Sequence, residues 1–183
     1  MRPAAITPLL AALACDPPAR PAAPTPHEVA APAPTPIREP ATGTPTDPDA
    51  IRSWLQALAY REWAPQTGVR ATGEHGGERL YFNAALAASM RAGNHDHPIG
   101  SAAVRELYAG DLITLKGFAL MHKLGPSGPT GEGWFWYEIF GTSADAEPTV
   151  AQAAAPGCVG CHSHAVDFVH APDTPRDDPQ PLL

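Results

Sequence analysis

The sequence has few positive charges and no long hydrophobic run. Only two of its 183 residues are lysines, Lys116 and Lys123, and the 12 Lys and Arg residues are outnumbered by 19 Asp and Glu, which gives a net charge of −7. A surface that binds nucleic acid needs clustered cations to hold the phosphates, so nucleic acid is not an expected partner. No stretch of about 18 apolar residues is present, which excludes a membrane-spanning helix.

Cysteine is scarce. The chain has three, Cys15, Cys158 and Cys161. Three cysteines are too few for a dense disulfide framework, and an odd number means that each needs an explanation of its own.

Phe, Trp and Tyr are absent from residues 16–47, where proline is abundant. Eleven of the 23 prolines lie between Asp16 and Pro48, mixed with alanine and threonine. Such a segment buries too little apolar surface to offset the entropy of ordering it. We therefore predict that residues 16–47 form a disordered spacer, stiffened toward polyproline II, whose reach at about 3.1 Å per residue is on the order of 100 Å.

Residues 1–15 resemble an export signal. A weakly basic start is followed by a short apolar run that ends in Ala12-Leu13-Ala14-Cys15. A small residue before a cysteine is similar to the bacterial lipoprotein signal, in which that cysteine becomes the acylated N-terminus. This predicts a periplasmic protein that is anchored to the membrane through acyl chains on Cys15. Ordinary signal-peptidase cleavage nearby, or an incidental cysteine in a disordered N-terminus, are the alternatives.

Residues 48–172 form the predicted folded domain, and residues 173–183 a disordered tail. Asp47 followed by Pro48 favours a helix start, and apolar residues at helical spacing predict a helix that continues to about Trp63. A second helix is predicted over Ala84–Arg91, ended by Gly93. Branched and aromatic residues between Gly- or Pro-containing turns predict strands over Leu80–Phe82, Ala102–Tyr108, Leu112–Leu124 and Gly133–Gly141. Short turns favour antiparallel pairing, so the predicted fold class is α+β, with a small antiparallel sheet and flanking helices.

The motif Cys158-Val159-Gly160-Cys161-His162 is typical of the attachment of a c-type haem. Two thiols three positions apart can each form a thioether with a haem vinyl group, and the adjacent histidine then binds the iron. The alternatives are a redox dithiol, a disulfide, or a zinc site that also uses His164. A redox dithiol usually lies near the start of a thioredoxin-like unit, and the four zinc ligands would be crowded in sequence. We therefore predict one covalent haem c per chain, attached to Cys158 and Cys161, with His162 as the iron ligand.

The place of this motif in the chain narrows the kind of haem protein. Only 21 residues follow His162, and the three methionines, Met1, Met90 and Met121, all precede it. A downstream methionine therefore cannot be the second axial ligand, as it is in ordinary small electron-transfer cytochromes. The predicted strands also conflict with the four-helix bundle of the cytochromes c-prime.

Several segments, taken in order, resemble the cytochrome P-460 family and cover nearly all of the predicted domain. They are Tyr60–Trp63, His75–Gly77, Leu80–Asn83, Pro98–Gly100, Val104–Tyr108, Gly117–Lys123, Gly133–Tyr137 and Asp167–Val169. The resemblance implies an antiparallel sheet with flanking helices, a C-terminal haem-attachment segment, a homodimer, and one five-coordinate haem bound by His162.

One position departs from the family pattern. Members that oxidise hydroxylamine carry a strand lysine bonded covalently to the haem ring, and the matching residue here is Arg105. A guanidinium stays protonated and is a poor nucleophile, so the same bond is not expected. The resemblance then points to the cytochromes c-prime-beta, which lack the bond and bind nitric oxide. In addition, Gln152–Ala155 offers no carboxylate where some catalytic members carry a proton-relay glutamate.

Three functions follow from these expectations. The favoured one is an exported mono-haem cytochrome that binds a small diatomic or nitrogen-oxide ligand, such as nitric oxide, at an open sixth site. Arg105 then lies either in the haem pocket or in an exposed salt bridge. The first alternative is an oxidoreductase that acts on hydroxylamine or nitric oxide. The second is a simple electron carrier, with both axial positions filled and a redox partner of its own.

The remaining histidines and aromatic residues are assigned more ordinary roles. His164 and His170 are expected to be exposed or to lie behind the iron ligand, with iron binding as the alternative. His95–His97 is expected to form a solvated loop, with weak metal binding as the alternative. Trp134–Tyr137 are expected in the sheet core and the dimer surface, with one ring bounding the distal pocket.

Overall fold

The computed structural model of the chain describes residues 43–65, 68–72 and 76–171. The predicted export signal, almost all of the predicted spacer and the predicted tail lie outside these residues, so the expectations about Cys15 stay predictions. None of the helices in the described residues is long and apolar enough to cross a membrane.

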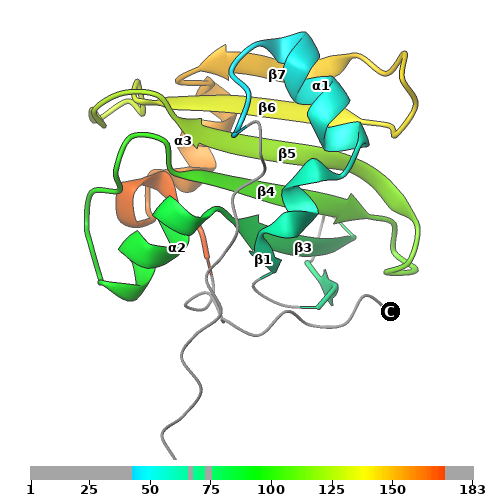
Figure 1. Cartoon of the computed structure of the whole chain (residues 1–183), viewed down its shortest axis with the longest axis horizontal. Coiled ribbons are helices and arrows are strands. Elements are labelled where there is room, and N and C mark those ends of the chain that lie inside the picture. The colour runs from blue at the N-terminus through cyan, green and yellow to red at the C-terminus, as the bar shows by residue number, and fades with distance from the viewer. Residues whose placement is uncertain (1–42, 66–67, 73–75, 172–183) are drawn as a thin grey trace, which may run out of the picture. The chain divides into compact units, whose positions relative to one another are not determined.

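The described residues form an antiparallel sheet of seven strands together with three α-helices (Figure 1). The strand order is β1-β3-β4-β5-β6-β7, and the short β2 also pairs with β3. Every neighbouring pair is antiparallel, which confirms the predicted α+β fold. The strands are β1 (Ala64–Pro65), β2 (Arg70–Ala71), β3 (Gly77–Phe82), β4 (Ala102–Tyr108), β5 (Leu115–Lys123), β6 (Trp134–Phe140) and β7 (Pro148–Ala153).

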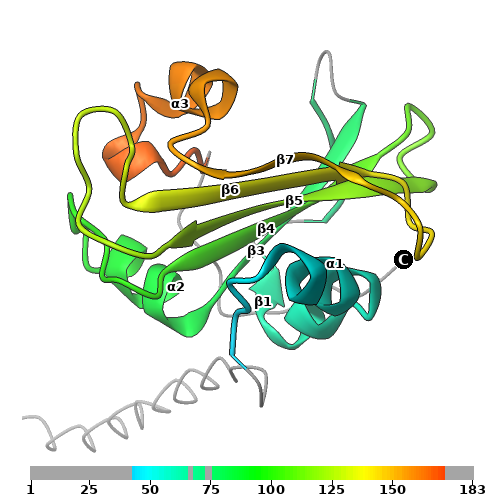
Figure 2. The ribbon, with the colours of Figure 1, turned by 90° about the horizontal axis from the view of Figure 1, so that it is seen from above.

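Helices lie on both faces of this sheet. α1 (Pro48–Gln56) packs on one face, and α3 (Pro156–His162) lies over the other (Figure 2). Successive side chains of a strand point to opposite faces, so β4 sends Val104 into an apolar cluster on the α1 side and Ala103 into a second cluster on the α3 side. The central strands are therefore buried along most of their length.

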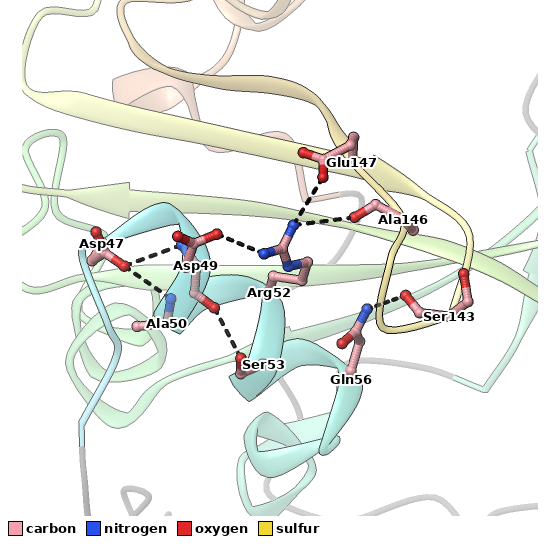
Figure 3. A network of polar contacts seen from close by, with 9 residues as sticks. All are labelled: Asp47, Asp49, Ala50, Arg52, Ser53, Gln56, Ser143, Ala146 and Glu147. Atoms are coloured by element: carbon pink, nitrogen blue, oxygen red, sulfur yellow. Dashed lines mark hydrogen bonds and ion pairs between the residues drawn. The ribbon is translucent and has the colours of Figure 1, made fainter.

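The start of α1 agrees with the sequence prediction. The Asp47 carboxylate accepts hydrogen bonds from the backbone N–H groups of Asp49 and Ala50, at 3.1 and 3.0 Å, and Pro48 occupies the first helical position. The helix also contacts the loop between β6 and β7, because Arg52 pairs with Glu147 at 3.4 Å (Figure 3).

The predicted end of this helix at Trp63 is wrong. α1 stops at Gln56, and Leu58 adopts a left-handed conformation with φ of 56°. A left-handed residue breaks the helical hydrogen-bond pattern, and the chain continues as a 3-10 turn, η1 (Ala59–Glu62).

Some of the remaining helices and strands were predicted from the sequence, and others were not. α2 (Ala84–Arg91) has the predicted bounds, and Gly93 follows it with φ of 69°. The predicted strand over Leu112–Leu124 begins later, because Asp111 closes a turn by accepting hydrogen bonds from the residues after it. β7 and the two-residue strands β1 and β2 were not predicted, because alanine-rich and very short segments give little strand signal.

Candidate functional site

The haem-attachment motif forms most of α3. Pro156 opens this helix, and Cys158 and Cys161 lie three positions apart, which places both thiols on one side. Cys158 is partly buried and Cys161 is exposed, and both line the same cavity. The structure therefore brings the two predicted attachment residues to one wall.

The ring of His162 is held by a backbone carbonyl. Its Nδ1 lies 2.7 Å from the carbonyl oxygen of Phe168. A carbonyl can only accept, so Nδ1 carries the proton and the lone pair of Nε2 is free to bind a metal. Burial lowers the pKa of His162, which favours the neutral ring that metal binding requires. The Trp136 ring packs edge-on against it, with the ring centroids 4.7 Å apart.

A large cavity lies between the sheet, α3 and the residues that follow α3. Its volume is about 1130 Å³, whereas drug-sized ligands occupy clefts of about 300–1,000 Å³, so a larger group can be accommodated. Beside His162 and the two cysteines, the lining is mainly apolar. The apolar lining residues include Leu80, Phe82, Met121, Trp136, Val150 and Val169.

Charged residues line the same cavity. Arg105 Nε lies 2.6 Å from Glu78 Oε2, and Arg70 pairs with the other oxygen of the same carboxylate. Glu78 is 8% exposed, so the two guanidinium groups share a nearly buried partner. Lys116 adds a third cation to the lining. Arg105 thus forms a salt bridge, although with a nearly buried partner and not the exposed one expected, and it also lines the cavity; its place in a haem pocket stays a prediction.

Strand pairing places a carboxylate that the sequence analysis missed. Arg105 on β4 and Glu138 on β6 both pair with Ala119 on the strand between them, so all three share one face. Glu138 lines the cavity, and its Oε1 accepts a hydrogen bond of 3.1 Å from Thr149. The stretch Gln152–Ala155 has no carboxylate, but the neighbouring strand supplies one. Residues two positions apart in a strand point to the same face of the sheet, so Glu138 shares the face of Trp136. This alternation is the sequence pattern that indicates its place.

The other predicted residues have mixed outcomes. His164 and His170 are exposed, as expected. The expectation of a solvated loop is wrong for His97, which is 3% exposed and hydrogen-bonded through Nδ1 to Ser89 at 2.9 Å. In the described part of the chain, no group of three or more His, Cys, Asp or Glu residues is arranged to hold a metal ion. Of the predicted aromatic group, Trp136 lines the cavity and Tyr137 belongs to the cluster on the α1 side.

No protein-family model matches the chain, and no curated protein matches it. The function of the site is therefore argued from the geometry of its residues alone. Two thiols on one helix, a neutral histidine with one free nitrogen and an adjoining large, mainly apolar cavity are the features that covalent attachment of a haem requires. The residues present fit that group.

Proposed function

We propose that this protein is an exported mono-haem c-type cytochrome, similar to the cytochrome P-460 family, that binds a small ligand such as nitric oxide at an open sixth site. The observation that carries the proposal is the hydrogen bond from His162 Nδ1 to the Phe168 carbonyl, which leaves Nε2 free beside a cavity lined by both cysteines. The haem, when bound, supplies an iron that can bind such a ligand.

The other uses of these cysteines fit the site less well. A reactive dithiol and a zinc site both need thiolates, and thiolates form readily where the pKa is lowered. Burial raises the pKa of Cys158 instead. A raised pKa is compatible with a thiol whose sulfur is to be capped as a thioether.

The charged residues of the lining affect which ligands the cavity binds. The Arg105 guanidinium stays protonated, so it contributes a permanent positive charge that Glu78 partly balances. This favours anionic ligands over neutral ones of the same size. It also disfavours a covalent bond from this position to a haem ring, since a protonated guanidinium is not a nucleophile.

Each alternative has one observation in its favour. Glu138 lines the cavity and could exchange protons with a bound nitrogen compound, as an oxidoreductase acting on hydroxylamine or nitric oxide would need. Met121 also lines the cavity and could fill the sixth site, as a simple electron carrier would need. The membrane anchor at Cys15, the homodimer and a redox partner belong to the proposal on sequence grounds.

Mass spectrometry and an absorption spectrum test the proposal together. The chain is produced in a periplasm with c-type cytochrome maturation, and we expect the mass of one haem on the peptide that contains Cys158–His162. We expect the ferric protein to be high-spin at neutral pH. Replacing Cys158 or Cys161 with alanine should reduce the fraction of chains that keep the haem covalently bound.

Three results would point elsewhere. A chain without covalent haem would reject the proposal as a whole. A low-spin six-coordinate ferric spectrum would favour the electron carrier. A third residue joined to the haem peptide would favour the oxidoreductase.

A further inference from the structure

A buried carboxylate lies five residues after His162. The side chain of Asp167, in the 3-10 turn η3 (Val166–Phe168), is 2% exposed. It accepts hydrogen bonds from Lys123 Nζ at 2.7 Å, the backbone N–H of His97 at 2.8 Å, Trp134 Nε1 at 3.2 Å and the Ser127 hydroxyl. These donors come from β5, β6 and two separate loops. One side chain therefore ties four distant segments to the turn that follows α3.

Lys123 makes this interaction a buried ion pair. Its side chain is 1% exposed, and it also pairs with Asp96. Burial alone would raise the pKa of Asp167, but the hydrogen bonds from Lys123 and Ser127 outweigh it and lower that pKa, so the carboxylate is ionised. Buried ion pairs are costly to desolvate and are often no more stable than packed apolar side chains. A role in holding the turn after α3 in one conformation would explain why an ion pair is buried here.

The backbone at this point is strained. Asp167 has φ of 45° and Phe168 φ of 64°, so two successive residues that are not glycine adopt left-handed conformations. Asp tolerates this region, but a bulky Phe rarely adopts it without support. The support is the set of hydrogen bonds on Asp167 and the burial of the Phe168 ring against Gly131. In this conformation the Phe168 carbonyl lies 2.7 Å from His162 Nδ1.

We propose that Lys123 and Asp167 are positioning residues, which hold the Phe168 carbonyl against His162 and so fix the protonated nitrogen and the orientation of its ring. Neither residue contacts the ring itself; they act through the turn between Asp167 and Phe168. A hydrogen bond from Nδ1 to a carbonyl makes the imidazole a stronger donor at Nε2. The consequence for iron rests on the proposed function, whereas the control of the ring does not.

The proton on His162 Nδ1 reports this control directly. We would measure its exchange with solvent by NMR in the purified full chain, in a diamagnetic state if haem is attached. Asp167→Ala should speed that exchange about tenfold or more, because the carbonyl is no longer held. Asp167→Asn keeps an oxygen acceptor and should show a smaller increase. Lys123→Met removes only the cation and should resemble the Asn variant. If haem is attached, the iron–histidine vibration of the ferrous protein should fall in the same order.

A matched control separates positioning from general stability. Glu106 is also buried and ion-paired, with Arg61, but it lies on the α1 side of the sheet. Glu106→Gln should lower the free energy of unfolding while leaving the Nδ1 exchange unchanged. If the chain carries no haem but exchange is faster in the Asp167 variants, the inference is supported, while the missing haem rejects the proposed function. Unchanged exchange in Asp167→Asn and Lys123→Met, in a chain with haem, would overturn the inference alone. Should Asp167→Ala fail to fold, these two milder variants decide.

Discussion

At the scale of single residues, Arg105 determines how charge is distributed in the cavity. It lines the cavity and pairs with Glu78 at 2.6 Å. In the haem-loaded protein, Arg105→Leu should weaken the binding of azide, an anion, by about threefold to tenfold. At an effective dielectric constant of 20, a charge placed about 10 Å from the bound anion would contribute about 1–2 kcal/mol, and Glu78 cancels part of it. Carbon monoxide, a neutral ligand, should bind within about twofold of the native protein. Optical titrations measure both affinities.

Arg52 supplies the control for that experiment. It is a half-buried arginine that also pairs with carboxylates, but it lies on α1, on the other face of the sheet. Arg52→Leu should leave both affinities unchanged. An equal loss for azide and carbon monoxide in Arg105→Leu would mean that the residue shapes the cavity and does not act through its charge.

Residues of the site differ in how far the sequence reveals them. Cys158 and His162 were predicted because their spacing in the chain is itself the chemical requirement. Glu138 and Asp167 were not, because each takes its place through contacts with segments far away in sequence. The register of three strands carries Glu138 to the face of Arg105. Asp167 becomes a buried hydrogen-bond acceptor only where β5, β6 and two loops converge.

At the scale of elements, Glu106 fastens η1 to β4. It is 0% exposed and accepts hydrogen bonds from Tyr60 at 2.6 Å, Arg61 at 2.8 Å and Tyr108 at 2.6 Å. Burial and the nearby carboxylate raise the pKa of both tyrosines, so their hydroxyls stay protonated and donate. Glu106→Gln should lower the free energy of unfolding by about 3 kcal/mol, because a buried ion pair is lost. Urea unfolding followed by tryptophan fluorescence measures this change.

Removing one donor gives a graded comparison for the same contact. Tyr108→Phe leaves the carboxylate with the other two partners, so it should cost only about 1 kcal/mol. If Glu106→Gln cost no more than Tyr108→Phe, the ion pair with Arg61 would add nothing to the hydrogen bonds. The turn η1 would then be held by the hydrogen bond from Tyr60 and by apolar packing, with no contribution from the charge of Arg61.

Most elements were predictable because local signals and tertiary structure agree. α2 has its predicted bounds since an asparagine cap and a glycine enclose it. The helix predicted to reach Trp63 fails at Leu58, whose left-handed conformation has no signal in the sequence. The adjoining turn is held by long-range contacts, through Tyr60 and Arg61 to Glu106. β7 was missed because its alanines favour no strand and its pairing with β6 defines it.

At the scale of the whole molecule, two histidines in different parts of the fold are buried. His97 packs beside α2, where it faces Asp167, Lys123 and Asp96, and His122 lies within β5. Burial lowers the pKa of both side chains, as it does that of His162, so in mildly acidic solution each ring is protonated less often in the folded protein than in the unfolded chain. In the unfolded chain each has a pKa of about 6.5. The unfolded chain therefore binds protons that the folded protein does not.

This difference predicts that the contribution of these histidines to stability falls as the pH falls below about 6.5, at up to about 1.4 kcal/mol per pH unit for each histidine, and is constant above it. Urea unfolding at pH 7.5 and 5.5 should show a loss of about 1–2 kcal/mol. Asp111 and Asp167 do not account for this window, since hydrogen bonds from Thr114 hold the pKa of Asp111 at about 2 and those on Asp167 also lower its pKa. The contribution of these carboxylates to stability is lost only in more acidic solutions. His97→Asn, which can still bond to Ser89, should reduce the slope of stability against pH between pH 5.5 and 6.5 without abolishing it, because His122 still titrates, and should leave the more acidic part of the curve unchanged. A full slope in both His97→Asn and His122→Asn would assign the effect to other groups.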